Sequence, residues 1–312
     1  MSIIIEQAPL SPSGGESTDI GGMFSLLWRT FKENRLAVVS LGVLVFFVLF
    51  SFVGPDIYHT NQTNQFAALT STIKGQTAVN YPWFHSWQDI LGTDSSGYNI
   101  VGRLMMGGRT ALVVGFLAGL ISTVVGSIWG AVSGYRGKVL DTLMMRFVDL
   151  GLSVPGLFLL IVIVVLFGAS STTIILTLGF TSWFGSSRLI RGETLSLKSR
   201  EFVHAVKVLG GSNRRIIFRH ILPNTMGTMI VVGTFAVADS ILALAALGFI
   251  GLGIPLPNTD WGDMLNTGVT YANDGYWWEI VPAAICIIVV VIALNYIGDA
   301  MRDAFEVRLQ KR

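Results

Sequence analysis

Four long apolar stretches constrain the fold of this chain more than any other feature of its sequence. They cover residues 36–53, 111–132, 147–167 and 280–297. A helix needs about 20 predominantly apolar residues to cross a lipid bilayer, and each stretch is close to that length. Residues 172–190, with several Ser and Thr, and residues 225–250, with Asp239, approach it as well. We therefore predict an all-α membrane protein with about six transmembrane helices.

The composition and the distribution of basic residues agree with this prediction. Charged residues make up 13% of the chain, against about 25% in soluble domains. If the N-terminus is inside, all but three of the 21 Lys and Arg residues fall in inner segments, which is the bias expected of cytoplasmic loops. The three outside are Lys74, Arg103 and Arg109. Both termini are therefore expected in the cytoplasm, and a net charge of +2 is too small to indicate a nucleic acid partner.

This topology divides the chain into four segments. Residues 1–22 are rich in Pro, Ser and Gly and have no basic segment before an apolar core. We expect a cytoplasmic tail of low order there, and not a cleaved signal peptide. Residues 23–55 hold the N-terminal segment and the first span. An external loop is expected at residues 56–110, and a helical core at residues 111–312.

The sequence offers no conventional catalytic or metal-binding constellation. Its single cysteine, Cys286, lies in an apolar run and is expected to pack inertly. The four histidines lack the spacing of metal ligands. The chain also lacks the G-x-x-x-x-G-K-[ST] loop that cradles phosphates. We therefore expect no cofactor on this chain, no metal site and no ATP binding of its own.

Five tryptophans fall in the two longer external loops: Trp83, Trp87, Trp261, Trp277 and Trp278. An indole ring has an apolar body and a polar N–H group, which suits the interface between membrane and water. We expect these residues at that interface. A docked partner protein is the alternative explanation.

The inner segment between the fourth and fifth predicted spans carries the strongest local pattern. Four apolar residues recur there at helical spacing on one face: Phe202, Val203, Val206 and Leu209. Gly210 and Gly211 can end this helix, Ser212 or Asn213 can cap a second one, and Pro223 is expected to end that second helix. Two short cytoplasmic helices joined by a turn are therefore predicted. Because the second is basic, the pair could simply lie flat on anionic lipid.

The order of residues in this segment resembles the cytoplasmic coupling loop of permease subunits of binding-protein-dependent ABC importers. In that family an acid and an alanine open a helix and a glycine follows at fixed spacing. Glu201, Ala205 and Gly210 occupy these places. Two later features also match, Ile217 and the ending Leu222-Pro223-Asn224. Val206 departs from the pattern, since the family often has a second alanine there.

Motifs elsewhere extend the resemblance to about residues 25–312 and favour the dipeptide, oligopeptide and nickel permease group. Before and within the second predicted span they are Leu91-Gly-Thr-Asp94, Gly97, Arg103, Gly108 and Arg109. Around the third they are Asp141, Arg146, Asp149 and Pro155. Late in the chain they are Gly248-Phe-Ile-Gly-Leu-Gly253, Trp261-Gly262 and Gly298-Asp-Ala-Met-Arg-Asp303. Tyr98-Asn99 departs from the family, which commonly has Arg-Asp there, so the role of this external turn stays open.

The resemblance implies a type I ABC importer permease fold in the bacterial cytoplasmic (inner) membrane, crossing it several times. The chain would then be a transport subunit and not an enzyme. With a second, homologous permease it would form a pathway for di- or oligopeptides. Two ATPase subunits or domains, which hold ATP and Mg, and an extracytoplasmic substrate-binding protein would complete the assembly. Nickel chelates, haem and other small solutes are alternative substrates.

The resemblance also implies which parts of the chain meet these partners. The loop at residues 199–223 would seat in a groove of an ATPase subunit through residues of the coupling motif: Glu201, Phe202, Ala205, Gly210, Gly211, Ile217 and Pro223. The binding protein would dock on the external loops at residues 54–110 and 255–278. The remaining partner of the chain is membrane lipid.

Glycines recur at four-residue spacing along the second predicted span: Gly115 and Gly119, then Gly126, Gly130 and Gly134. Such spacing lets another helix backbone approach closely. We expect helix packing at this groove, either within the chain or against a second permease. A contribution of its exposed part to the substrate path is the alternative.

Asp239 is the main ionisable residue expected near the middle of the membrane, where a charge costs about 2.5–3.5 kcal/mol on insertion scales. It either faces the translocation path and meets a peptide amine, or pairs with a polar group such as Asn295 and fixes the helix bundle. Three other acids near the inner ends of spans are expected to form local ion pairs with Arg146 or Arg302: Asp149, Asp299 and Asp303.

Two functions from other classes compete with the importer. An ion-driven secondary transporter would require several ionisable residues at mid-membrane and broken helices in paired halves, whereas one clear acid is found. A non-transporting scaffold would use the cytoplasmic helix pair to bind a signalling partner. Stimulation of ATP hydrolysis by substrate would exclude the scaffold.

Overall fold

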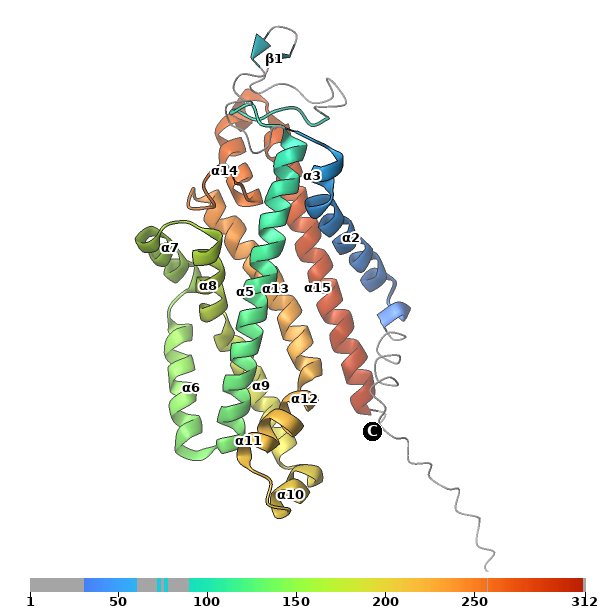
Figure 1. Cartoon of the computed structure of the whole chain (residues 1–312), viewed down its shortest axis with the longest axis vertical. Helices are drawn as coiled ribbons and strands as arrows, with labels where there is room; N and C mark the ends of the chain where they lie inside the picture. Colours follow the sequence, from blue (N-terminus) through green and yellow to red (C-terminus); the bar gives the residue numbers. More distant parts are fainter. Residues whose placement is uncertain (1–30, 61–71, 74–75, 78–89, 257, 311–312) are drawn as a thin grey trace, which may run out of the picture.

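The computed structural model describes residues 31–60, 72–73, 76–77, 90–256 and 258–310. These residues are almost entirely helical, and the long helices run side by side along one axis (Figure 1). Strand β1 (Thr72–Ile73) pairs with β2 (Gln76–Thr77) in a small antiparallel hairpin. The predicted tail at residues 1–22, Trp83 and Trp87 lie outside the described residues.

Four helices are long and apolar enough to cross a membrane: α2 (Arg35–Phe52), α5 (Ile100–Arg136), α13 (Met226–Phe249) and α15 (Val281–Gln310). They correspond to the first, second, fifth and sixth predicted spans. A fifth span is present if α6 (Lys138–Ser153) and α7 (Gly156–Phe167) are counted as one bent helix. The predicted helical membrane fold is therefore confirmed, and the count of six spans stays a prediction.

The third and fourth predicted spans are each built from two helices. Helices α6 and α7 meet at 77° across Val154 and Pro155. Proline has no N–H to donate and disfavours a helical conformation in the residue before it, so Val154 is extended. Helices α8 (Ser171–Thr181) and α9 (Trp183–Lys198) meet at Ser182. Both breaks lie on the same side of α5 in Figure 1.

Helix α5 begins at Ile100, so residues 100–110 are helical and do not belong to the external loop as predicted. Asn99 caps its start, with its Oδ1 accepting from the N–H of Gly102 at 3.0 Å. The sequence analysis did not assign this segment to a transmembrane helix, because it contains two adjacent glycines and two arginines. Those glycines instead allow close packing, because a Cβ at Gly107 would lie 2.9 Å from Cδ1 of Trp261.

Helix α5 lies at the centre of the bundle because its glycines admit two neighbours. A Cβ at Gly119 would lie 2.7 Å from Cγ2 of Val237 on α13, and one at Gly126 would lie 2.8 Å from Cβ of Ser186 on α9. The whole predicted groove is filled within this chain, by α13 at Gly115 and Gly119 and by α9 at Gly126, Gly130 and Gly134.

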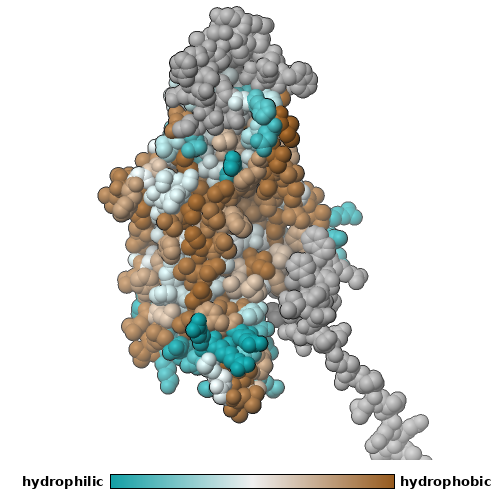
Figure 2. All heavy atoms as spheres, viewed as in Figure 1, coloured by the Kyte–Doolittle hydropathy of each residue, from teal (hydrophilic) through white to brown (hydrophobic). Residues whose placement is uncertain are grey.

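The middle of the molecule is apolar on its outside as well as in its core. Figure 2 shows hydrophobic side chains over the helices and hydrophilic ones gathered toward the ends. Phe46, Phe116 and Ile288 are each more than half exposed. Contiguous exposed apolar surface of this kind marks contact with lipid or with protein partners.

The second segment predicted to be external folds back onto the bundle as helix α14 (Trp261–Tyr271), followed by short turns at Ala272–Asp274 and Trp277–Glu279. Trp261 is buried and donates its indole N–H to the carbonyl of Leu104 at 3.0 Å. Trp278 is buried too, and its indole N–H lies 3.4 Å from the carbonyl of Thr93. The interface prediction is therefore wrong for these two residues. Trp277 remains exposed.

Candidate coupling surface and transport cavity

The segment after α9, which was predicted to be cytoplasmic, is a helix, a tight turn and a second helix. Helix α10 (Glu201–Val208) is followed by Gly210, whose φ of 79° lies in the left-handed region that favours glycine. The N–H of Gly211 donates to the carbonyl of Val206 at 2.9 Å and closes the turn. Ser212 then caps α11 (Asn213–Ile216). Any other residue at position 210 would strain this turn.

The second helix continues past Pro223 instead of ending at it. A π-helical turn (Ile217–Ile221) and α12 (Leu222–Asn224) follow α11, and the break before α13 falls at Thr225. Proline in a regular α-helix clashes with the carbonyl four residues earlier. The wider π turn ahead of Pro223 gives room for its ring.

One face of the helix pair is packed against the membrane helices. Four of its residues are buried in one cluster with Ala131 and Tyr135 of α5 and Ile190 of α9: Val203, Ile216, Ile217 and Ile221. Ile217 thus anchors the pair to the bundle and does not face outward. The pair must therefore follow any movement of the inner ends of α5 and α9.

The rest of the helix pair exposes an apolar surface at one end of the molecule, which we call the coupling tip: Phe202, Val208 and Leu209. Phe202 and Leu209 were predicted on one face with Val203, but they are exposed whereas Val203 is buried. Val208 is 86% exposed and Leu209 is 85% exposed. Glu201, Ala205, Gly210 and Pro223 are exposed as well, and Gly211 is half-buried. Figure 2 shows this tip projecting beyond a hydrophilic zone. An exposed apolar tip with a polar rim is typical of a docking surface for protein.

Two ion pairs join α9 to α6. Arg191 contacts Asp141 through two hydrogen bonds, of 2.6 and 2.7 Å. Arg188 contacts Asp149 at 2.5 Å. The sequence predicted that Asp149 pairs with Arg146, but its partner in the structure is Arg188 of α9. These contacts connect the helix that leads into α10 with the helix that ends at the Pro155 break.

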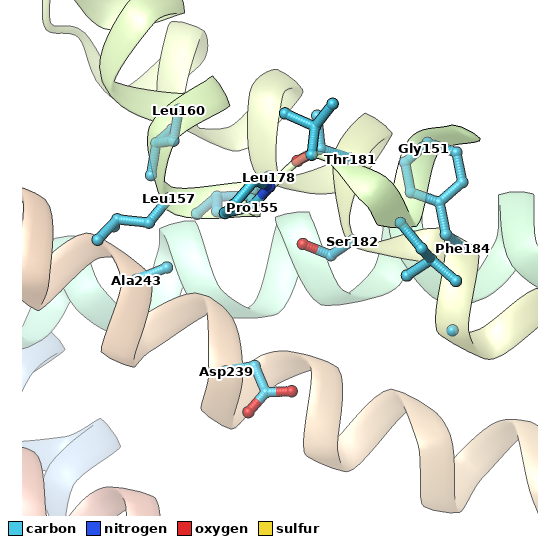
Figure 3. Close-up of a pocket in the computed structure, with 14 residues that line it drawn as sticks. Gly151, Pro155, Leu157, Leu160, Leu178, Thr181, Ser182, Phe184, Asp239 and Ala243 are labelled. Atoms are coloured by element: carbon cyan, nitrogen blue, oxygen red, sulfur yellow. The ribbon is translucent and has the colours of Figure 1, made fainter. Parts of the chain in front are cut away.

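A cavity of about 440 Å³ lies where the two helix breaks face α13 (Figure 3). Pro155 and Gly156 come from the first break, Thr181 and Ser182 from the second, and Asp239 from α13. Most of the remaining lining is apolar. The volume falls within the range of small-molecule sites, about 300–1,000 Å³. Non-helical backbone at membrane depth is tolerated where it is buried in protein or lines a water-filled cavity.

Asp239 is exposed and forms no hydrogen bond or ion pair with the residues that the structure describes. At 1.5 Å per residue it stands roughly 20 Å from the inner end of α13 at Met226. Figure 3 shows it across the cavity from Ser182. Asn295, the other residue proposed for the path, does not line this cavity.

A buried polar cluster holds the outer end together. The guanidinium of Arg103 hydrogen-bonds to Asp263 and Thr259 at 2.9 Å each, and its Nε lies 3.4 Å from Asp94. It also lies over the ring of Tyr98, 5.2 Å from the centroid. Burial raises the pKa of Asp94, although the charge of Arg103 acts in the opposite direction. Tyr98 and Asn99, which depart from the family pattern, therefore pack this cluster and cap α5.

Asp260 fixes the turn between α13 and α14. Its side chain is fully buried and accepts from the N–H of Ile254 at 3.1 Å and from that of Asp263 at 3.0 Å. Burial raises its pKa to about 6. Sequence reasoning missed Asp263 because its partner Arg103 lies about half the chain away, and it missed Asp260, whose partners are backbone N–H groups of its own turn. Asp94 and Arg103, which belong to the sequence motifs, were the residues from which a buried polar cluster could have been predicted.

Apolar helices that break around a cavity, with an exposed apolar tip at one end of the bundle, fit a membrane permease. Residues 122–311 match the family model described as binding-protein-dependent transport system inner membrane component. Residues 22–71 match the N-terminal transmembrane domain of oligopeptide transport permease C. The chain therefore belongs to the binding-protein-dependent family of inner membrane transport components, as a multi-pass permease subunit related to OppC and DppC.

Individual relatives agree with this assignment. The dipeptide transport system permease protein DppC of Bacillus subtilis is 36% identical, over 91% of this chain and 85% of the relative. The oligopeptide transport system permease protein OppC of Haemophilus influenzae is 38% identical, over 89% of this chain and 86% of the relative. A solved structure of the MetNI methionine ABC transporter, inward facing, matches with a TM-score of 0.53 and 18% identity, over 65% of this chain and 95% of that one. The last likeness supports the fold alone.

Proposed function

We propose that this chain is a permease subunit of an ATP-driven importer of di- or oligopeptides. The observation that carries the proposal is the helix pair, whose buried residues pack on α5 and α9 while its coupling tip is exposed. A cytoplasmic ATPase that binds this tip can transmit its own movement to the two helices. The names of the relatives, dipeptide and oligopeptide permeases, supply the class of substrate.

The proposal includes a topology of six spans with both termini in the cytoplasm. The four long helices and the bent pair α6–α7 are long and apolar enough for five spans, and α8 with α9 would form the sixth. The excess of Lys and Arg in the inner segments sets the orientation. It places the coupling tip in the cytoplasm and α14 outside.

The chain would work with a second homologous permease, two ATPase subunits or domains, and an extracytoplasmic substrate-binding protein. ATP and Mg would be held by the ATPase subunits, and this chain would bind no cofactor. The outer surface around α14 would receive the binding protein. Asp239 of α13 would line one half of the translocation path, and Asn295 of α15 is the second residue proposed for it.

Affinity purification from gently solubilised membranes tests the coupling function. The unmodified chain should recover an ATPase and a second permease. Gly210→Pro should lose the ATPase, because proline cannot adopt the φ of 79° at this turn. Glu201→Arg should lower ATP hydrolysis stimulated by loaded binding protein. Both variants should still insert in the membrane.

Gly42→Ala serves as the control, because a Cβ at Gly42 meets no atom within 4 Å. It should recover the same partners as the unmodified chain. If both coupling variants retain the ATPase and its stimulation, the coupling assignment is wrong. If the unmodified chain transports with an ion gradient and no ATP, a secondary transporter replaces the importer.

A further inference from the structure

The cavity between the helix breaks contains one charged group with no protein partner in the described part of the chain. Asp239 projects from α13 at roughly 20 Å from its inner end, and the break at Val154–Pro155 lies roughly 24 Å from the inner end of α6, counted at 1.5 Å per residue. The two features therefore stand at similar depth. A carboxylate placed there without a partner is costly and is by default a functional group.

The cavity wall opposite Asp239 is largely apolar but presents polar groups at the two helix breaks. Pro155 interrupts the helix, and neither α7 nor α9 has a side-chain cap at its first turn. Ser182 is exposed at the second break, and Thr181 beside it also lines the cavity. Backbone groups released by such breaks require water or a polar ligand. Two independent features thus indicate a hydrated cavity with a single negative charge.

The charge defines which ligand fits. Among the described residues that line the cavity, Asp239 is the one charged residue, and no Lys or Arg balances it. A negative group in a partly enclosed, low-dielectric site attracts cations and excludes anions. Its volume of about 440 Å³ suits a small organic molecule more than a bare ion.

We propose that this cavity is a cation-selective cargo subsite, in which Asp239 receives a positively charged group of the transported molecule. For a peptide that group is the terminal ammonium, and the hydroxyls and freed backbone groups at the two breaks face the rest of the cargo. This inference rests on the proposed transport function. It assigns to Asp239 a binding role and not a role in fixing the helix bundle.

Charged thiol reagents test the subsite without knowledge of the natural cargo. In a Cys286→Ala background, Ser182→Cys places a thiol of similar size across the cavity from Asp239. The assembled complex in nanodiscs is treated with cationic aminoethyl methanethiosulfonate or with anionic sulfonatoethyl methanethiosulfonate. The ratio of the two labelling rates should fall about tenfold when Asp239→Asn is added, because the attraction is electrostatic. Asp239→Glu should preserve the ratio.

Ser199→Cys, on the exposed cytoplasmic end of α9, is the matched control. Its labelling ratio should not respond to Asp239→Asn, because Ser199 does not line the cavity. An unchanged ratio at position 182 would overturn the inference. Failure of both reagents to reach position 182 would also overturn it, because a protein segment would then fill the cavity.

Import of dialanine into proteoliposomes gives the second measurement. At saturating binding protein, Asp239→Asn should lower the import rate about tenfold, and Asp239→Glu should restore most of it. If Asp239→Asn imports at the unmodified rate, the subsite is wrong and the importer stands. If the variant releases the second permease, Asp239 pairs with that partner and the subsite is again wrong. If the unmodified chain shows no ATP-dependent import of any peptide, the proposed function itself fails.

Discussion

Arg191 of α9 forms two parallel hydrogen bonds with the carboxylate of Asp141 on α6, from Nε at 2.6 Å and from Nη2 at 2.7 Å. Ser133 of α5 donates to the same carboxylate. One acid therefore joins three helices close to the coupling tip. Because α10 follows α9 and α6 ends at the Pro155 break, this contact connects the helix pair that carries the coupling tip with the cavity wall.

We predict that Asp141→Asn and Arg191→Gln each uncouple ATP hydrolysis from transport. Hydrogen bonds between charged groups contribute about 1.5–3 kcal/mol, and each substitution removes one of the two ion pairs that join α6 to α9. The stimulation of ATPase activity by loaded binding protein should fall several-fold while the complex still assembles. The exchange Asp141→Arg with Arg191→Asp should recover part of the stimulation. Full stimulation in both single variants would contradict this role.

The close approach of α5 and α9 predicts a strong steric effect at Gly130. A Cβ there would overlap the carbonyl oxygen of Ser187 and lie 2.9 Å from the backbone N of Arg191. Gly130→Leu should therefore destabilise the protein by about 3 kcal/mol or more. Thermal unfolding in detergent measures the effect. Gly42→Leu, which has open space around it, should leave the melting temperature nearly unchanged, and equal melting of the two variants would be evidence against the packing.

Two substitutions of Trp261 distinguish the contribution of its hydrogen bond to stability from the contribution of its packing. Trp261→Phe removes the indole N–H that donates to Leu104 and should cost about 1 kcal/mol. Trp261→Ala also empties a fully buried site and should cost about 3–5 kcal/mol. Thermal unfolding of the two variants measures both values. A similar small loss in both would show that Trp261 lies at the membrane interface, as the sequence had suggested.

Asp260 predicts a pH dependence of stability. Its folded pKa of about 6 exceeds the ordinary value of 3.8, so the folded state binds a proton more tightly than the unfolded state. The resulting stabilisation is complete below pH 3.8 and is lost as the pH rises through 6; it amounts to about 3 kcal/mol. As the pH falls from 7 to 4.5, the free energy of unfolding of the unmodified chain should therefore rise relative to that of Asp260→Asn. A constant difference over this range would rule out titration of Asp260.

The sequence alone determined the features that depend on local pattern. Apolar stretches of spanning length identify helices because lipid offers the backbone no hydrogen bonds. The helical spacing of the apolar residues between Phe202 and Leu209, followed by a glycine pair, predicted the helix pair. Caps and turns of this kind follow from residues close together in the sequence. Asp239 was singled out because a charge at membrane depth is exceptional.

Only the tertiary structure decided which of these residues meet. Asp149 pairs with Arg188 instead of Arg146, and Arg103 joins Asp94 to Asp263 across the chain. Trp261 is buried because α14 folds back onto α5, and Gly107, which looked like a loop residue, allows that contact. Such contacts depend on how separate helices are placed in space. The sequence pattern shows which face of each helix is apolar, but it does not show which helix packs against that face.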